Sequence, residues 1–377
     1  MEKTNEFNIE LGKLKLDKNV NTYALVESLK QGIGDLMNSQ TYKKYLDFCS
    51  KLYNYSNNNK LLIFFQNPDA SYVGSFTFWK ANKRYVNRGE KGIMILAPVT
   101  KKEMEIVSEK RPDGTIKEVE QEVLKIVSFK PTYVFDISQT SGEPIPTILK
   151  KLSGKSNESE LLIDGIKNIC KLPIIEDNQN RLGNANGAFD PKNNEILYSP
   201  KISSNQLAKT LIHEYTHSKL HDKIDDYVIN RDRYEIEAES AAYMVCKHFG
   251  LDTSDYSFGY ITSWATGKEI KDYEDSLKLS SDVSKQIINE LNGYFEHLLV
   301  KQKQHIKAEL NKNHFKDNEK LIDNIHKLYI TTNSSSLKDI KELCTKDIPE
   351  ETRSLLSSVT DELKKQEVKL MSQQPSR

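Results

Sequence analysis

The first part of the chain alternates between helical and strand-like spacing of its apolar residues. Over residues 22–65 these residues stand three or four positions apart, which predicts helices. Asn57-Asn58-Asn59 interrupts this pattern as the start of a new helix. Ser75 is a favourable N-cap and predicts a further short helix over residues 75–83.

Strand patterns follow this short helix. The apolar run Ile93–Ala97 predicts a buried strand that ends at Pro98, because proline lacks a backbone donor. Residues 104–128 alternate as a hairpin does, with Pro112-Asp113-Gly114 at the turn. Residues 132–137 predict one more strand, so the first half is expected to be α+β.

The second half is predicted to be mainly helical around a small sheet. Residues 141–158 are rich in glycine, proline and serine and are the expected linker between the halves. The predicted elements are a helix at 159–171, two short strands near 186–189 and 195–198, and helices at 204–222 and 232–249. From about residue 280 to the end the pattern is again helical and rich in lysine and glutamate.

Composition narrows the class of protein. At 377 residues the chain is long enough for two or three domains. Its 54 basic and 54 acidic side chains cancel, which argues against a uniformly basic nucleic-acid-binding coat but leaves local patches open. No apolar run approaches the ~20 residues of a membrane span, and the polar start of the chain predicts no secretory signal. Four scattered cysteines without a Cys-x-x-Cys pair are typical of reduced thiols in a cytoplasmic protein.

The motif His213-Glu214-Tyr215-Thr216-His217 carries the strongest chemical signal. Its two histidines are four residues apart on a predicted helix, so both imidazoles face the same way and can share one metal ion. Glu214 lies beside them as the candidate general base of a metal-assisted hydrolysis. The alternative is a surface helix that carries two solvated histidines.

The next predicted helix offers the third ligand that a catalytic zinc site needs. Glu235 is followed by Ala238 and Ala242, whose small side chains let this helix approach the first one closely. Glu235 is the predicted ligand, with Glu239 or Glu237 as alternatives. Glu239 is expected to accept a hydrogen bond from a ligand histidine. Glu237 lies roughly 200° round the helix from Glu235 and is expected to face solvent.

Other groups near this motif have weaker patterns. His221 is expected to pack as a polar core residue. Tyr256 and Tyr260 are candidate donors to an oxyanion, although aromatic core packing is the simpler explanation. The predicted hairpin 185–199 offers an edge strand to an extended peptide. Zinc suits the ligand set, and manganese or another divalent ion also fits it.

Several short motifs resemble those of a known family. The segment 46–98 is similar to the single-stranded-DNA-binding N-terminal domain of the ArdC-type antirestriction proteins, and Val134–Thr140 resembles the end of that domain. The second half is similar to the zincin-like peptidase domain of the same proteins and to the ImmA/IrrE metallopeptidases. The motifs that carry the resemblance in the first half are Tyr55–Asn59, Gln66–Ala70, Trp79 and Arg88–Ile93.

The resemblance implies an α+β fold, with a DNA-binding domain and a zincin-like, mainly helical metallopeptidase domain that contains a small β-sheet. It implies a metal held by His213, His217 and Glu235, with Glu214 as base. It does not cover the helical C-terminal extension. The expected segments are residues 1–140, the linker 141–158, residues 159–279 and residues 280–377. Such proteins occur on plasmids and other mobile elements, where they shield incoming DNA from host restriction.

A basic segment supports the expected contact with single-stranded DNA. Between Trp79 and Lys102 there are seven basic residues and one acid, with aromatic residues interleaved. Exposed cations and stacking rings are what single-strand binding needs. The alternative is a solvated cationic face over an aromatic core, and a core position is favoured for Phe76, Phe78 and Trp79. The candidate DNA contacts are Lys80, Lys83, Arg84, Arg88 and Lys91.

Two other functions stay open from the sequence. An ImmA-like regulatory metalloprotease would bind a protein with its first domain and cleave a repressor or another partner at the metal site. A binding protein with a structural metal would not need Glu214 at that site. The expected partners are single-stranded DNA and, in addition, a protein substrate or a restriction enzyme; no membrane partner is expected.

Overall fold

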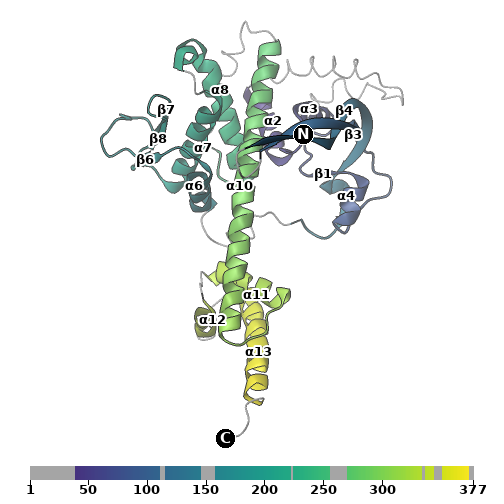
Figure 1. Cartoon of the computed structure of the whole chain (residues 1–377), viewed down its shortest axis with the longest axis vertical. Coiled ribbons are helices and arrows are strands. Elements are labelled where there is room, and N and C mark those ends of the chain that lie inside the picture. Colours follow the sequence, from purple (N-terminus) through teal and green to yellow (C-terminus); the bar gives the residue numbers. More distant parts are fainter. Residues whose placement is uncertain are drawn as a thin grey trace, which may run out of the picture. The chain divides into compact units, whose positions relative to one another are not determined.

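A computed structural model gives the fold of the chain (Figure 1). It describes residues 39–110, 115–145, 158–221, 224–254, 270–332, 336–343 and 350–372. The chain divides into two compact units, Met1–Pro144 with Ser257–Ser281 and Ile145–Tyr256 with Asp282–Arg377. Helices and small sheets are combined in the described residues, which confirms the predicted α+β class.

Serine caps start two helices of the first unit. The helices described here are α2 (Ser39–Lys51), α3 (Asn57–Gln66) and α4 (Phe76–Ala81). The Ser56 hydroxyl accepts a hydrogen bond from the Asn59 backbone N–H and caps α3, so the predicted helix start is confirmed. Ser75 caps α4 in the same way, as predicted. The expected helical residues 22–38 lie outside the described part of the chain.

The main sheet of this unit is a long hairpin. The strands are β1 (Val73–Gly74), β3 (Ile93–Lys110) and β4 (Ile116–Asp136), in the order β1-β4-β3. The predicted hairpin and the predicted strand at 132–137 are therefore parts of one antiparallel ladder. The predicted turn at Pro112-Asp113-Gly114 lies outside the described residues.

Pro98 does not end the strand, contrary to the prediction, because its position lies on the open edge of β3. The side-chain amide of Gln66 bonds to both backbone groups of Met94, and the amide of Asn59 bonds to both backbone groups of Leu96, at 2.8–3.0 Å. These backbone groups therefore point away from β4. Pro98 stands two residues further on and faces the same edge, so its missing N–H costs no bond to β4.

Asp136, the last residue of β4, links the residues before β1 to the turn after β4. Its carboxylate accepts hydrogen bonds from the backbone N–H groups of Ser71, Tyr72 and Ser138 and from the Ser138 hydroxyl. Burial opposes its ionisation, but these bonds outweigh burial and hold the pKa of Asp136 below its usual value. The neighbouring short elements are η2 (Ile137–Gln139), and β5 (Thr140–Gly142) paired with β2 (Arg84–Val86).

The second unit is built round one helix, α7 (Figure 1). Its elements are α6 (Glu158–Ile169), β6 (Ile174–Glu176), β7 (Gly187–Asp190), β8 (Glu195–Tyr198), α7 (Ser204–Leu220) and α8 (Ile224–His248). β8 lies between β6, which is parallel to it, and β7, which is antiparallel. α7 packs against α6, α8, β7 and β8. β6 is too short to show a pattern and was not predicted, and α8 begins at Ile224, eight residues before the predicted start; the other elements agree with the prediction.

The C-terminal part is helical, as predicted. Its helices are α10 (Ile270–Lys312), α11 (Glu319–Thr332), α12 (Leu337–Leu343) and α13 (Glu350–Ser372). The expected boundary between residues 279 and 280 falls inside α10, whose first residues, up to Ser281, belong to the first unit. The later helices share an apolar core that includes Ile306 and Val359. Among the described helices, none is long and apolar enough to cross a membrane.

Candidate metal centre

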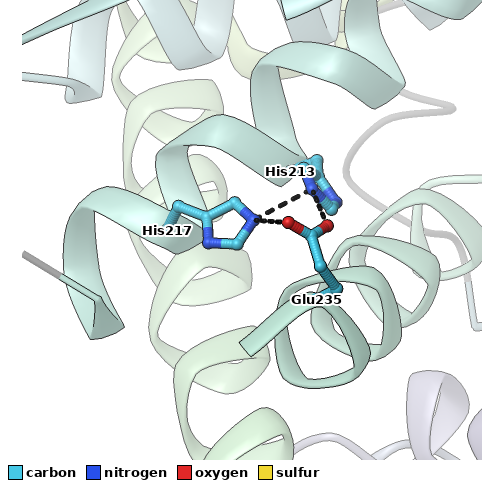
Figure 2. Close-up of side chains that lie close together, drawn as sticks. All are labelled: His213, His217 and Glu235. Carbon is cyan, nitrogen blue, oxygen red and sulfur yellow. Dashed lines mark hydrogen bonds and ion pairs between the residues drawn. The ribbon is translucent and has the colours of Figure 1, made fainter. Parts of the chain in front are cut away.

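Helix α7 places two histidines on one face. The Ser203 hydroxyl caps the helix by accepting a hydrogen bond from the Gln206 N–H. One helical turn separates His213 from His217, so both imidazoles point into the same space. Their Nε2 atoms are 3.0 Å apart. Figure 2 shows the two rings and the Glu235 carboxylate turned toward one another.

Helix α8 brings Glu235 to the same point. Ala238, Ala241 and Ala242 are completely buried, and their small side chains allow close packing of α8. The Glu235 carboxylate oxygens lie 3.5 Å from Nε2 of His213 and 3.8 Å from Nε2 of His217. The site therefore combines two imidazoles from α7 with one carboxylate from α8.

These three side chains fit a divalent metal ion. Their ligand atoms all lie within 4.8 Å of one another. The separations of 3.0–3.8 Å bracket the spacing of about 3.3–3.6 Å that ligands adopt around a tetrahedral zinc ion. Three protein ligands leave a fourth position for water or substrate, which is the arrangement of catalytic rather than structural zinc.

The electrostatics of the site favour a cation. Burial acts to lower the pKa of His213, but contacts with Glu235 and Glu239 and the nearby charge of Glu214 raise it to about 10. The same negative charge that holds a proton on His213 would stabilise a metal ion in its place. The pKa of His217 is lowered, mainly by burial, which keeps this imidazole neutral as a metal ligand must be.

Glu239 lies on the other side of His213 from Glu235. Its Oε2 atom is 3.2 Å from Nδ1 of His213, which is the neighbour that the sequence predicts for it. Nδ1 nevertheless makes no hydrogen bond, because a separation of 3.2 Å does not by itself satisfy the angular requirement of such a bond. The contact between Glu239 and His213 is therefore electrostatic.

Glu214 faces the edge strand β7. Its Oε2 atom accepts a 2.8 Å hydrogen bond from the Phe189 backbone N–H. Burial raises the pKa of Glu214 and outweighs the opposite effects of His213 and of this hydrogen bond. A raised carboxyl pKa brings the group closer to the range of an effective general base. Gly187 permits the contact, because a Cβ there would lie 2.4 Å from Cγ2 of Thr210 and 3.3 Å from Cγ of Glu214.

Behind His217 the structure corrects the sequence-based interpretation. Glu237, expected to face solvent, is completely buried. It bonds to His221 and Arg233, at 3.1 Å and 2.7 Å. His221 is a buried polar residue, as predicted, and its Nδ1 atom lies 2.9 Å from Nδ1 of His217. The spacing of His221 is visible in the sequence, but nothing in the sequence signals Glu237. The candidate donors Tyr256 and Tyr260 lie outside the described residues.

The predicted DNA contacts do not share one environment. Lys80, Lys83, Arg88 and Lys91 are exposed on the first unit. Arg84 instead directs its guanidinium inward, where it donates hydrogen bonds to the Thr140 hydroxyl and to the carbonyl groups of Thr140, Gly142 and Glu143, at 2.6–3.2 Å. These bonds hold the segment after β4 against β2. They give Arg84 a structural role, and its contact with DNA stays a prediction.

The aromatic residues of the same segment differ in their burial. Trp79 is completely buried and donates a 2.9 Å hydrogen bond from Nε1 to the Phe135 carbonyl, which confirms its predicted core position. Phe76, predicted to be core, is 59% exposed because it starts α4 on its outer side, and Tyr85 is 62% exposed. Both rings are accessible for stacking, and several exposed cations precede or follow them in the sequence.

Comparison with known families identifies this part of the chain. Residues 17–135 match the family described as the N-terminal domain of anti-restriction factor ArdC. The chain carries an ArdC N-terminal domain. The match ends directly before Asp136, whose hydrogen bonds link the residues before β1 to the turn after β4.

The chain is also similar to individual proteins over a longer stretch. An uncharacterized protein of Bacillus anthracis is 29% identical over 275 residues, which are 65% of this chain and 47% of that protein. The chain thus spans about half the length of this curated relative. A metal-free crystal structure of the antirestriction ArdC protein from the R388 plasmid is 19% identical, with a TM-score of 0.37 over 64% of this chain and 86% of that one. Its Mn(II)-bound structure is 17% identical, with a TM-score of 0.35 over 67% and 97%.

Proposed function

We propose that this ArdC-type protein acts in antirestriction, with a first unit that binds single-stranded DNA and a second unit that is a zinc-dependent metallopeptidase. The observation that carries the enzymatic half is the convergence of His213, His217 and Glu235 next to the buried Glu214. A structural metal site would need no buried carboxylate with a raised pKa next to its ligands in the sequence.

Each residue has a role in the proposed hydrolysis. His213, His217 and Glu235 would hold a zinc ion, which would act as a Lewis acid toward a water molecule and a carbonyl group. Glu214 takes the proton from the water and passes it to the leaving amine. The edge strand β7 lies beside Glu214 and is suited to pair with an extended peptide, which makes a polypeptide the proposed substrate.

The nucleic-acid half of the proposal rests on the ArdC domain and on its exposed groups. Lys80, Lys83, Arg88 and Lys91 supply positive charge, and Phe76 and Tyr85 supply accessible rings. Phosphate contacts and stacking of this kind give binding that is nearly blind to sequence and weakens as salt rises. We further propose that the protein is encoded on a mobile element and acts in the cytoplasm, where its free buried cysteines stay reduced.

Metal analysis tests the enzymatic half. The purified full-length protein is incubated with zinc or with manganese and is then desalted. The protein incubated with zinc is expected to retain one zinc ion per chain. His213→Ala should lose it, whereas His297→Ala, which removes an exposed histidine from α10, should not. Glu214→Gln should retain the metal and abolish cleavage of a mixed peptide library followed by mass spectrometry. Cleavage by Glu214→Gln at the wild-type rate would exclude the proposed base.

Gel-shift titrations with single-stranded DNA at rising salt test the other half. Replacing Lys83, Arg88 and Lys91 together by alanine should weaken binding and reduce its salt dependence. The matched control replaces three exposed lysines of the second unit by alanine, with the same loss of charge: Lys171, Lys192 and Lys201. Equal weakening by both triple variants would show that net charge, not the ArdC domain, causes the binding.

A further inference from the structure

A buried line of hydrogen bonds continues behind the metal ligand His217. Nδ1 of His217 lies 2.9 Å from Nδ1 of His221, and Nε2 of His221 lies 3.1 Å from Oε2 of Glu237. Oε1 of Glu237 accepts a 2.7 Å hydrogen bond from Nε of Arg233. The His221 and Glu237 side chains are 1% and 0% exposed, so solvent does not compete for these bonds.

The chemistry of the groups gives this line a direction. An ionised carboxylate only accepts hydrogen bonds, so His221 must donate its Nε2–H to Glu237. With a single ring proton placed on Nε2, His221 has a lone pair on Nδ1, which can accept the Nδ1–H of His217. A neutral His217 that is protonated on Nδ1 has its lone pair on Nε2. That atom is the one that faces His213 and Glu235.

The remaining contacts hold the line in place. The guanidinium of Arg233 pairs with the Glu237 carboxylate, with Nε 2.7 Å from Oε1. The Tyr234 ring stacks on the His221 ring, with centroids 4.1 Å apart and planes 20° apart. This stacking fixes the ring plane in which the two nitrogen atoms of His221 lie. The other ligand histidine has no such line in the described residues, since Nδ1 of His213 contacts Glu239 without a hydrogen bond.

We propose that Glu237 and His221 are positioning residues that fix His217 in the tautomer whose Nε2 atom binds the metal. The proposal rests on the metal site of the proposed function and extends it to two residues that touch neither metal nor substrate. Residues behind a ligand histidine typically change metal affinity by about 10- to 100-fold when they are removed. A purely structural network would lower stability without changing the tautomer of His217.

Two substitutions at His221 separate these roles. Glutamine can accept from His217 through its carbonyl oxygen and donate to Glu237 through its amide, so His221→Gln preserves the direction of the line. Phenylalanine retains the stacking on Tyr234 but neither accepts nor donates, so His221→Phe breaks the line. His221→Phe should bind zinc about 10- to 100-fold more weakly than wild type in a competition with a chelator. His221→Gln should retain most of the affinity.

Glu237→Gln provides a second variant in case His221→Phe fails to fold. A glutamine amide can donate to Nε2 of His221 and so allows the reverse tautomers, which should weaken zinc binding by a similar factor. The matched control is Glu290→Gln, because Glu290 also bonds to side chains of α7, namely Tyr215 and Lys219, both at 2.9 Å, but lies outside the line. This control should bind zinc as wild type does.

The tautomer is measured directly by the nitrogen chemical shifts of ¹⁵N-labelled histidine in the full-length chain. His213→Ala serves as the background, because it removes the neighbouring ring that also contacts Nε2 of His217. In this background His217 should be protonated on Nδ1, and adding His221→Phe or Glu237→Gln should shift it toward protonation on Nε2.

The zinc-affinity and tautomer measurements distinguish a failure of the positioning role from a failure of the proposed metal site. An unchanged tautomer, or zinc affinities equal to wild type in folded His221→Phe and Glu237→Gln, would overturn the positioning role. If wild-type protein binds no zinc, the proposed metal site is wrong, while the tautomer of His217 still decides whether the line has the inferred direction.

Discussion

Replacing Gly187 by alanine would push β7 away from α7 and release Glu214. An added Cβ would lie 2.4 Å from Cγ2 of Thr210 and 3.0 Å from the carbonyl oxygen of Leu197. Because carbon atoms that are not bonded prefer separations of about 3.5–4.0 Å, β7 has to move by roughly 1 Å. The 2.8 Å hydrogen bond from Phe189 to Glu214 would then exceed the range of about 2.7–3.2 Å for such bonds.

The cost has two parts. Inserting a methyl group into a packed contact costs about 1–3 kcal/mol, and losing a hydrogen bond to a charged group costs about 1.5–3 kcal/mol. Because the strand relaxes partly, we expect a loss of about 2–4 kcal/mol in unfolding free energy. Zinc affinity should not change, since the three ligands come from α7 and α8 and not from β7.

Thermal unfolding and zinc competition test both expectations on one protein. The midpoint should fall by roughly 4–16 °C. Gly293→Ala is the matched control, since a Cβ there meets nothing within 4 Å. As a helical position it should gain up to about 1 kcal/mol. Wild-type stability of Gly187→Ala would refute the close approach of β7, and loss of zinc would show that β7 also holds the ligands.

Three further predictions concern other parts of the molecule. Asp136→Asn should lower the unfolding free energy of the ArdC domain by about 1.5–3 kcal/mol. Because the pKa of Asp136 is lowered in the fold, the extra stability of the wild type is complete above the ordinary pKa of about 4 and is lost as the pH falls through the lower folded pKa. Urea titrations across acid pH would show this loss. Apparent zinc affinity should rise by up to about tenfold per pH unit while the pH is below the His213 pKa of about 10, because zinc binding displaces the proton of His213. A zinc affinity that does not change with pH in chelator competition would contradict a protonated His213 in the metal-free protein. Tyr85→Ala should cost about 1–3 kcal/mol of single-stranded-DNA affinity without changing the unfolding midpoint, whereas Trp79→Phe should lower the midpoint and leave DNA affinity intact.

Local signals in the sequence predict many of the elements. Ser56, Ser75 and Ser203 cap α3, α4 and α7, and a cap acts on residues only two or three positions away. The pair His213 and His217 is equally local, because one helical turn determines its geometry. These features are predictable because they need no knowledge of the rest of the fold.

The misinterpreted residues depend on contacts between segments far apart in the chain. Pro98 was expected to end a strand, but the edge that it faces is set by Asn59 and Gln66 on α3. Glu237 was assigned to solvent from its angle on the helix, yet its partner His221 lies beyond the end of α7. The structural role of Arg84 is equally invisible in the sequence, because charge alone does not show that carbonyl groups around residue 140 take up its donors.

Helix α10 ties the integrity of the ArdC domain to residues more than a hundred positions downstream of it. The completely buried Lys60 donates a 2.6 Å hydrogen bond to Ser281, and the Tyr42 ring packs edge-on against Tyr273 at 6.1 Å. A fragment that stops at Pro144 lacks Ser281 and Tyr273, and losing a hydrogen bond from a buried ammonium group is costly. Genetic exchange that moves one contiguous cassette would therefore deliver a weakened N-terminal domain. Selection should accordingly keep the two halves of this gene together.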